Sequence, residues 1–319
     1  IAFINLATCY RALEQNEQAL EYYNRAFEIN PATKKGMYVN NEYGFMLVEM
    51  GKLEEARETF ELMLSGKDTK ARGLRSLALL NTYTGHFSKA IDQFKEAALV
   101  NKSNGIGLSE YRDRMYLARA YKVKGMEKEF NRELDEIDQL MENMNLSPSW
   151  LAKAGKLYAR NNMLDKAEQI LVKIEQNIGN IVATSAVNRN TNQDQAFYYH
   201  LKGEIALGRK NFEEARESLV LANNIVELPD VLAYCYYQTG EWEKAIENYR
   251  KVIEEKSLNN EMQLEWILAH YRLAKIYEQQ EQPDRALAYY EQFLDIWEDG
   301  DEDIEVLQEA RTRVESLRI

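Results

Sequence analysis

The sequence is poor in the residues that interrupt helices. Its 319 residues include only 4 prolines and 15 glycines, which leaves little material for a turn-rich β architecture. Hydrophobic residues make up 45% of the chain and aromatic residues 11%, which is ample for a folded core. The composition therefore favours an all-helical protein.

Cysteine and histidine are also scarce, and their spacing indicates no metal or redox centre. Cys9 and Cys235 lie far apart, each within an apolar helical stretch, which favours two buried, reduced thiols over a disulfide or a metal pair. The three histidines, His86, His200 and His270, lie in different parts of the chain and form no recognisable set of metal ligands. We therefore expect neither a metal nor another cofactor.

The chain has no apolar run of eighteen or more residues and no signal peptide at its start. We therefore expect a soluble segment without a membrane span, and we favour a cytoplasmic location, although the sequence does not identify the compartment. The chain begins with Ile1 inside an amphipathic pattern and without an initiator Met, which indicates a piece of a longer polypeptide.

The sequence has fewer basic than acidic residues. Lys and Arg number 40 against 52 Asp and Glu, which gives a formal net charge of -12. Such a charge repels phosphate backbones and argues against direct nucleic-acid binding.

Catalytic motifs are missing as well. The stretch LSGKDT ends like a phosphate-binding loop, but the first glycine of that motif would fall on Glu61, whose side chain blocks the approach of a phosphate. No Gly-x-Ser-x-Gly elbow and no plausible Cys-His pair is present. We expect a protein that is not an enzyme.

What the sequence does contain is one repeated pattern. It consists of apolar residues at helical spacing, a short turn, and then a small residue followed four positions later by an aromatic or leucine. Residues 6–31 and 271–297 show it at opposite ends of the chain, and Phe130 replaces the small residue in the degenerate fourth of eight copies. The small residues of the other copies are Ala19, Ala56, Ala90, Ala167, Ala215, Ala245 and Ala286.

A second series of small residues precedes the turn in each copy. Two antiparallel helices approach closely only where a small side chain faces the neighbour, so these residues mark helix crossings. A single hairpin leaves an apolar face exposed, so hairpins stack and each buries the next. The residues of this series are Ala7, Gly44, Ala78, Ala118, Gly155, Gly203, Ala233 and Ala274.

In these two series the chain resembles the tetratricopeptide repeat family over nearly its whole length. The resemblance implies an all-α, right-handed superhelical solenoid of about eight helical hairpins, in which the first helix of each pair lines a concave groove. The repeats are spaced irregularly around the family period of about 34 residues, which indicates insertions.

We expect one continuous solenoid with a single long interruption. Repeats one to five occupy residues 1–178, a polar connector occupies 179–196, and repeats six to eight occupy 197–319. The connector is the best candidate for a mobile loop. A C-terminal capping helix is expected to shield the last hairpin. Its apolar residues are Ile304, Leu307, Val314 and Leu317.

The family geometry implies that the second, fifth, ninth and twelfth residues of each first helix face the groove. In repeats three to five these positions carry, or lie beside, basic residues and no carboxylate, while repeat two adds aromatic and amide groups. An acidic peptide with apolar groups would fit such a surface. The alternative is that these cations pair with acidic residues of neighbouring helices. The predicted groove residues are Tyr38, Asn41, Phe45, Arg72, Arg75, Arg112, Arg119, Lys122, Lys156 and Arg160.

The leading hypothesis is a non-catalytic protein–protein interaction scaffold that binds a peptide or partner segment in its concave groove. The second hypothesis is a C-terminal sensor or regulatory array of a bacterial Ser/Thr kinase, nucleotide cyclase or transcription regulator whose effector domain lies upstream. It rests on residues 289–317, which resemble the ends of repeat arrays in bacterial multidomain signalling proteins. The sequence identifies neither the partner nor the oligomeric state.

Overall fold

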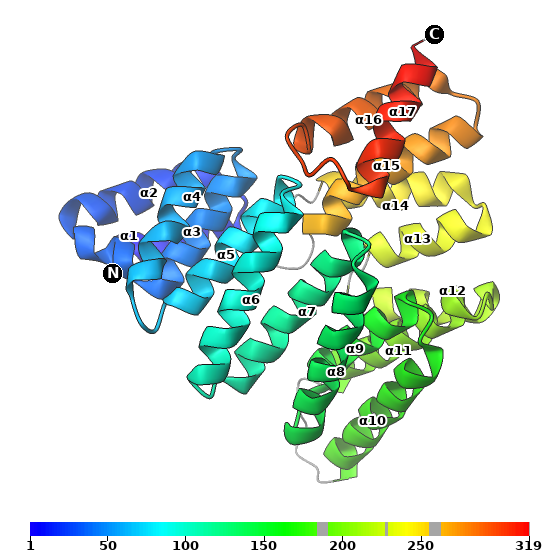
Figure 1. Cartoon of the computed structure of the whole chain (residues 1–319), viewed down its shortest axis with the longest axis horizontal. Coiled ribbons are helices and arrows are strands. Elements are labelled where there is room, and N and C mark those ends of the chain that lie inside the picture. The colour runs from blue at the N-terminus through cyan, green and yellow to red at the C-terminus, as the bar shows by residue number, and fades with distance from the viewer. Residues whose placement is uncertain (184–190, 227–228, 255–262, 319) are drawn as a thin grey trace. The chain divides into compact units, whose positions relative to one another are not determined.

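The computed structural model describes residues 1–183, 191–226, 229–254 and 263–318, and every regular element within them is a helix (Figure 1). None of these helices is long and apolar enough to cross a membrane. The α-helices are α1 (Ala2–Ala12), α2 (Asn16–Ile29), α3 (Met37–Glu49), α4 (Leu53–Glu61), α5 (Lys70–Tyr83), α6 (Phe87–Ser103), α7 (Gly107–Val123), α8 (Glu127–Asn143), α9 (Pro148–Arg160), α10 (Leu164–Ala183), α11 (Thr191–Gly208), α12 (Phe212–Asn223), α13 (Pro229–Thr239), α14 (Trp242–Glu254), α15 (Gln263–Gln279), α16 (Pro283–Ile296) and α17 (Glu305–Leu317). Two short 3₁₀ helices are η1 (Pro31–Lys35) and η2 (Leu62–Ser65).

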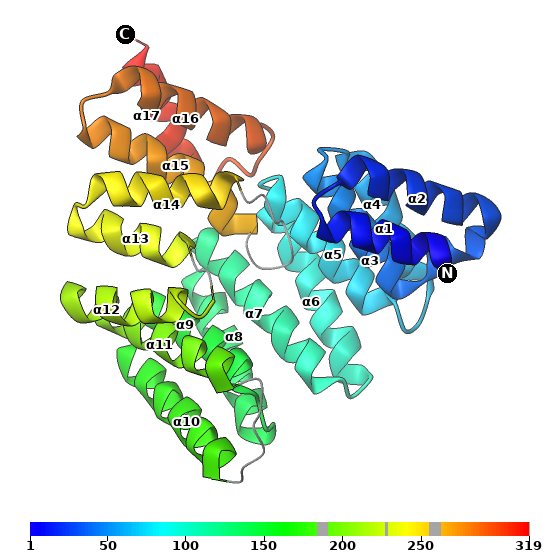
Figure 2. The same cartoon turned by 180° about the vertical axis from the view of Figure 1, so that it is seen from behind.

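Each odd-numbered helix from α1 to α15 is followed by a tight turn, and the next helix runs back beside it (Figures 1 and 2). One residue of every such turn has a left-handed backbone, with φ between 56° and 80°. The next N–H donates to the carbonyl five residues earlier at 2.8–2.9 Å, which closes the C-terminus of the first helix. The left-handed residues are Glu14, Gly51, Gly85, Gly125, Asn162, Lys210, Gly240 and Glu281.

These turns confirm the register predicted from the sequence. In each case the left-handed residue precedes by five the small residue of the second helix, and the degenerate Phe130 follows the same rule after Gly125. The seven alanines of that series are all 0% exposed. At Gly44 an added Cβ would lie 2.2 Å from the ring of Phe60, and at Gly203 it would lie 2.5 Å from Leu219. Such crossings admit only glycine.

The chain divides into two compact units, which differ from the expected division. The first unit comprises residues 1–137, 256–267 and 292–315, and the second comprises 138–255, 268–291 and 316–319. The expected connector is shorter than predicted, because α10 continues to Ala183 and α11 begins at Thr191. The middle of that connector, residues 184–190, lies outside the described residues.

In the first unit, the segment before α17 packs against the turn between α5 and α6. Trp297 is 0% exposed; its ring lies edge-on to Phe87, and its Nε1 donates to the carbonyl oxygen of Tyr83 at 3.2 Å. Asp301 accepts hydrogen bonds from the backbone N and Oγ of Ser88, at 2.7 and 2.8 Å. Residues 297–303, together with the 83–88 turn, are termed the clasp.

The predicted capping helix is present as α17. Three of its expected apolar residues are buried, Ile304, Leu307 and Val314. The prediction of two buried thiols is half correct. Cys235 is buried, which raises the pKa of its thiol to about 11, whereas Cys9 is exposed because it lies on the outer face of α1, in the first hairpin.

Candidate functional site

In the first unit, Arg75 of α5 is paired with a buried carboxylate of α7, Asp113. Asp113 accepts hydrogen bonds from Nε and, at 3.1 Å, Nη2 of Arg75, and from Nδ2 of Asn101 at 2.6 Å. The Arg75 and Asp113 side chains are 7% and 0% exposed. Burial raises the pKa of Asp113, although Arg75 opposes the shift. The ion pair joins α5 to α7 and occupies the Arg75 guanidinium group.

Two further guanidinium groups lie near this ion pair without a carboxylate of their own. Arg72 has its Cζ 5.1 Å from the ring centroid of Tyr38, and Nε of Arg112 is buried without a hydrogen-bond partner among the described residues. Neither arginine forms an ion pair within the described part of the chain. Burial and then the charge of Arg75 lower the pKa of both groups, so the three cations repel one another. Arg72, Arg75 and Arg112 are termed the arginine cluster.

The predicted residues on either side of the cluster are mostly engaged. Asn41 is buried and its Oδ1 accepts a hydrogen bond from the Ser76 hydroxyl at 3.2 Å. Phe45 is only 1% exposed and packs against Phe60, so it belongs to the hairpin core and not to the surface where the sequence placed it. Tyr38, by contrast, is 70% exposed and remains available to a partner.

The cations further along α7 also have internal partners. Nη2 of Arg119 lies 2.6 Å from a carboxylate oxygen of Glu265, and Nζ of Lys122 lies 2.6 Å from a carboxylate oxygen of Glu127. In these two positions the structure agrees with the alternative of internal pairing. The positive charge that exceeds the local carboxylates is concentrated on Arg72 and Arg112.

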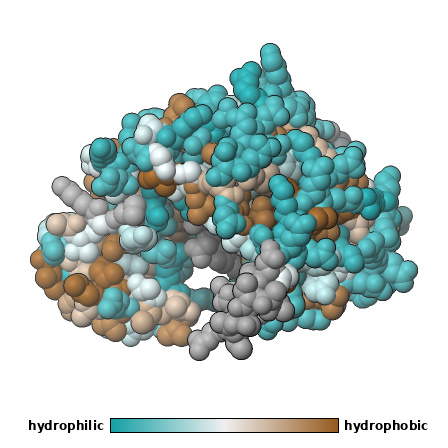
Figure 3. Space-filling model, turned by 90° about the horizontal axis from the view of Figure 1, so that it is seen from below, coloured by the Kyte–Doolittle hydropathy of each residue, from teal (hydrophilic) through white to brown (hydrophobic). Residues whose placement is uncertain are grey.

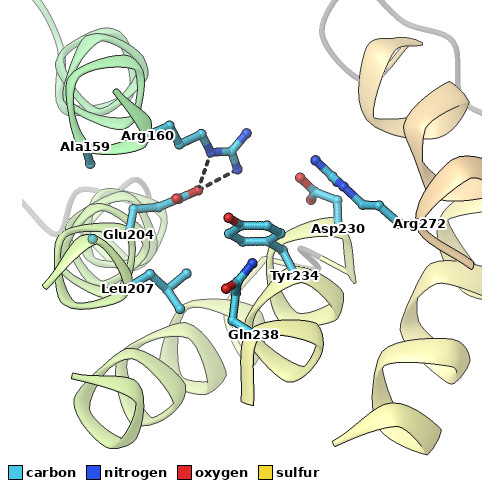
Figure 4. A pocket seen from close by; sticks show the side chains of 9 residues that line it. Ala159, Arg160, Glu204, Leu207, Asp230, Tyr234, Gln238 and Arg272 are labelled. Carbon is cyan, nitrogen blue, oxygen red and sulfur yellow. Dashed lines mark hydrogen bonds and ion pairs between the residues drawn. The ribbon is translucent and has the colours of Figure 1, made fainter. Parts of the chain in front are cut away.

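The second unit contains a pocket of about 290 Å³ (Figure 4). Its lining comes from the first helices of four consecutive hairpins, α9, α11, α13 and α15. Most of the residues occupy the fifth, ninth, twelfth or thirteenth position of their repeat, counted with the small residue as the eighth. This concavity is termed the first-helix pocket. It is lined by Ala159, Arg160, Glu204, Leu207, Gly208, Asp230, Tyr234, Gln238 and Arg272.

One wall of the first-helix pocket is a buried ion pair. Nε and Nη2 of Arg160 lie 2.9 and 2.5 Å from Oε1 of Glu204, which is 3% exposed. Burial alone would raise the pKa of Glu204, but Arg160 and His200 outweigh it and lower the pKa. Burial, assisted by the charge of Lys156, lowers the pKa of His200 to about 4. At neutral pH Glu204 is therefore an anion and His200 is uncharged.

The opposite wall is built from an arginine and aromatic rings. The guanidinium carbon of Arg272 lies 5.3 Å from the ring centroid of Tyr234 and 5.8 Å from that of Tyr249. Figure 4 shows Tyr234 between the Arg160–Glu204 pair and Asp230, with Arg272 beyond Asp230. Stacking on two rings restricts the arginine side chain, so its position is largely set before a ligand arrives.

Of the residues that line this pocket, only Arg160 was predicted from the sequence. That prediction rested on surplus positive charge at groove positions, whereas the pocket combines both signs of charge with neutral polar groups. The same positional rule applied to repeats six and seven names Glu204, Asp230 and Tyr234, which occupy fifth or ninth positions. Gln238 and Arg272 lie at the thirteenth and sixth positions of their repeats, outside the rule.

The face of the molecule drawn in Figure 3 is mainly hydrophilic. On the face drawn in Figure 3, hydrophobic residues gather in separate patches between hydrophilic ones. Large exposed apolar side chains occur on α1 and its flanks, where Ile1, Leu6 and Leu13 are 100%, 42% and 66% exposed. No described feature shows what covers them, so the polar first-helix surfaces are the stronger candidates for a specific site.

Comparison with protein families agrees with this architecture. Tetratricopeptide repeat profiles match residues 1–32 and 229–299, at opposite ends of the chain. Both ends of the chain are therefore tetratricopeptide repeats. One curated relative of this repeat protein is the photosystem I assembly protein Ycf3 of Synechococcus sp. (strain CC9605), 26% identical over 145 residues, which are 43% of this chain and 79% of the relative.

Solved structures share the fold of this tetratricopeptide repeat protein at low sequence identity. The human IFIT1 dimer with m7Gppp-AAAA has a TM-score of 0.54 and 18% identity, over 98% of this chain and 71% of that chain. A chain of the APC/C hetero-tetramer Cut9-Hcn1 has a TM-score of 0.46 and 13% identity, over 92% of this chain. The present chain spans about half of that protein, 52%. Of these two likenesses only the one to IFIT1 bears on the fold, and it bears on nothing else.

Proposed function

We propose that this protein is a non-catalytic scaffold that holds a segment of a partner polypeptide against its first helices. The observation that carries the proposal is the first-helix pocket, where four consecutive hairpins contribute charged, aromatic and amide side chains to one concavity. Pockets with a few convergent polar groups are the usual places for ligand recognition. The similarity to a photosystem I assembly protein supports a role in holding partners during assembly.

The charge of the chain supports a protein partner over a nucleic acid. A formal net charge of -12 repels a phosphate backbone at long range. It also limits non-specific binding of acidic proteins, so an acidic segment is accepted only where local charge reverses the sign. The arginine cluster is such a place.

We further propose that the arginine cluster receives acidic side chains of the partner. Arg72 and Arg112 serve as charge-assisted donors, and Tyr38 supplies an exposed aromatic contact. Arg75 remains on Asp113 and positions α5 beside α7.

The other predicted groove cations have smaller roles in this proposal. Arg119 is held by Glu265 in the same way that Arg75 is held by Asp113. Lys122 is exposed enough to exchange Glu127 for a partner carboxylate, whereas Lys156 and Arg160 belong to the second unit and act there.

The test compares two labelled synthetic peptides of equal length, one with glutamates around a tyrosine and one with glutamines in their place. We expect the whole chain to bind the glutamate peptide more tightly, with an affinity that falls as salt is added. Arg72→Gln combined with Arg112→Gln is expected to weaken binding about tenfold or more, because charge-assisted hydrogen bonds contribute roughly 1.5–3 kcal/mol each.

A matched control removes two charges from elsewhere in the first unit. Arg25 on α2 and Arg132 on α8 are both exposed. Replacing both with Gln changes the net charge by the same amount as the Arg72→Gln and Arg112→Gln pair. If the two double variants bind the glutamate peptide equally, net charge and not the cluster governs binding, and the assignment to Arg72 and Arg112 fails.

A further inference from the structure

The first-helix pocket differs from the arginine cluster in that its charges cancel. Its lining contains two cations, Arg160 and Arg272, and two carboxylates, Glu204 and Asp230. Glu204 is neutralised by direct contact with Arg160. Such a site attracts neither anions nor cations from solution, so any specificity must come from hydrogen bonds and shape.

Three side chains of the pocket keep unused hydrogen-bonding capacity. Gln238 is exposed, and neither its amide nor the hydroxyl of Tyr234 bonds to another group among the described residues. Arg272 stacks on aromatic rings and makes no hydrogen bond or ion pair to another residue of that part of the chain, so its guanidinium donors can serve a ligand. The open groups therefore offer several donors and at least two acceptors, one amide oxygen and one phenolic oxygen.

A peptide group matches this set. Within one trans peptide group the N–H and C=O point in opposite directions, but the N–H and C=O of one residue in an extended chain point to the same side, and the primary amide of Gln238 can pair with both of these. The N–H groups of Arg272 suit a second carbonyl oxygen of an extended chain. A ligand carboxylate fits less well, because the two carboxylates of the lining already match its two cations and a further anion would leave the pocket with a net negative charge.

The size and walls of the pocket limit what accompanies the peptide groups. A volume of about 290 Å³ lies at the small end of the roughly 300–1,000 Å³ found for ligand pockets, which is enough for one large side chain. Ala159 and Leu207 supply apolar surface, and the Tyr234 ring supplies a face for stacking.

We propose that the first-helix pocket binds an extended, uncharged segment of a polypeptide, with Gln238 and Arg272 bonding its peptide groups and Tyr234 contacting one aromatic or aliphatic side chain. The proposal rests on the proposed scaffold function and names the partner chemistry of one of its surfaces. A charged side chain is disfavoured here because the two cations of the lining are already balanced by its two carboxylates, so a further buried charge would be left unbalanced.

The experiment selects binders from a phage-displayed library of random peptides on the whole chain. We expect one class of selected peptides to be free of Asp, Glu, Lys and Arg over the contacting positions, and to bind with little dependence on salt. Gln238→Leu keeps the side-chain bulk and removes the hydrogen bonds, and it is expected to weaken this class about tenfold. Arg272→Lys, which loses the planar donors, is expected to weaken it similarly.

The matched control is Gln169→Leu, which makes the same change at an exposed site on α10, a second helix of the second unit. It is expected to leave the affinity of the uncharged class unchanged. Thermal unfolding of the three variants verifies that each remains folded, and Gln238 is exposed enough for its replacement to be tolerated.

Two results would overturn the inference. Selected peptides that are all acidic, and that respond to Arg72→Gln with Arg112→Gln but not to Gln238→Leu, would leave the scaffold function intact and remove the pocket from it. Uncharged peptides that bind Gln238→Leu and Gln169→Leu equally well would place their site elsewhere. If the whole chain selects no peptide of either class, the scaffold function itself fails.

Discussion

The arginine cluster and the first-helix pocket are built from the same parts in different proportions. Each lies on first helices and centres on an arginine paired with a buried carboxylate, Arg75 with Asp113 and Arg160 with Glu204. The cluster adds two unpaired cations, whereas the pocket adds one cation and one carboxylate. The repeat thus sets the positions of the side chains. The local balance of positive and negative charges then determines which kind of ligand each surface binds.

The largest expected difference between the two regions concerns their carboxylates. Asp113→Ala removes every acceptor oxygen from Arg75, which is 7% exposed, and we expect a loss of about 3–5 kcal/mol in the free energy of unfolding. Glu204→Ala should lose less, about 1–3 kcal/mol, because Arg160 is 36% exposed and can be hydrated. Urea denaturation measures both. Equal losses would mean that burial of the arginine does not distinguish the two pairs.

Acid should destabilise the pocket region through His200. Its pKa is about 4 in the folded protein and near 6.5 when unfolded, so the folded state excludes the proton. The contribution of neutral His200 to stability is complete above pH 6.5. As the pH falls toward 4, the free energy of unfolding decreases by up to about 3 kcal/mol. Glu204, whose pKa is also lowered, adds a loss of the same sign at lower pH.

The cluster responds to acid in the opposite direction, since the pKa of Asp113 is raised and protonation favours the folded state. Hydrogen exchange at pH 7 and pH 4.5 should therefore show protection lost around α11 before α7. In His200→Gln the slope of unfolding free energy between pH 6.5 and 4 should be shallower than in the unmodified protein. Parallel slopes would contradict the assignment of that proton to His200.

The smallest expected effects have opposite signs in the two regions. Arg112→Met relieves repulsion with Arg75 and fills the same space, so we expect no loss and up to about 1 kcal/mol of added stability. Arg272→Met removes the stacking on Tyr234 and Tyr249 and should destabilise by about 1 kcal/mol. Differential scanning calorimetry on both variants measures these changes in stability. If Arg112→Met is destabilised, Arg112 contributes to the stability of the fold and is not simply available for ligand binding.

Local spacing was enough to predict the fold, because each hairpin is specified by nearby residues. The small residues, the turn and the helix length lie within about 34 residues of one another, and the structure keeps that register even at Phe130. Phe45 shows the limit of a positional rule, since the rule names a face of the helix but not how close the second helix comes to it.

The site could be predicted only in part, because ion pairs depend on distant residues. Arg119 pairs with Glu265, 146 residues away, and nothing in the spacing of α7 indicates that partner. Arg75 pairs with Asp113 from the next hairpin, which sequence spacing places outside the expected groove positions. Cations at groove positions were therefore visible in the sequence, but which of them remain available was not.

The clasp has a consequence for the order of folding. In an open repeat array each hairpin contacts only its neighbours, so structure can start anywhere and spread. The bond from Trp297 to Tyr83 spans 214 residues, and closing so long a loop in an unstructured chain opposes folding by about 5 kcal/mol of entropy. The clasp must therefore form after the intervening hairpins have shortened that loop. We therefore expect Trp297 to become buried late in folding, after most of the hairpins have formed.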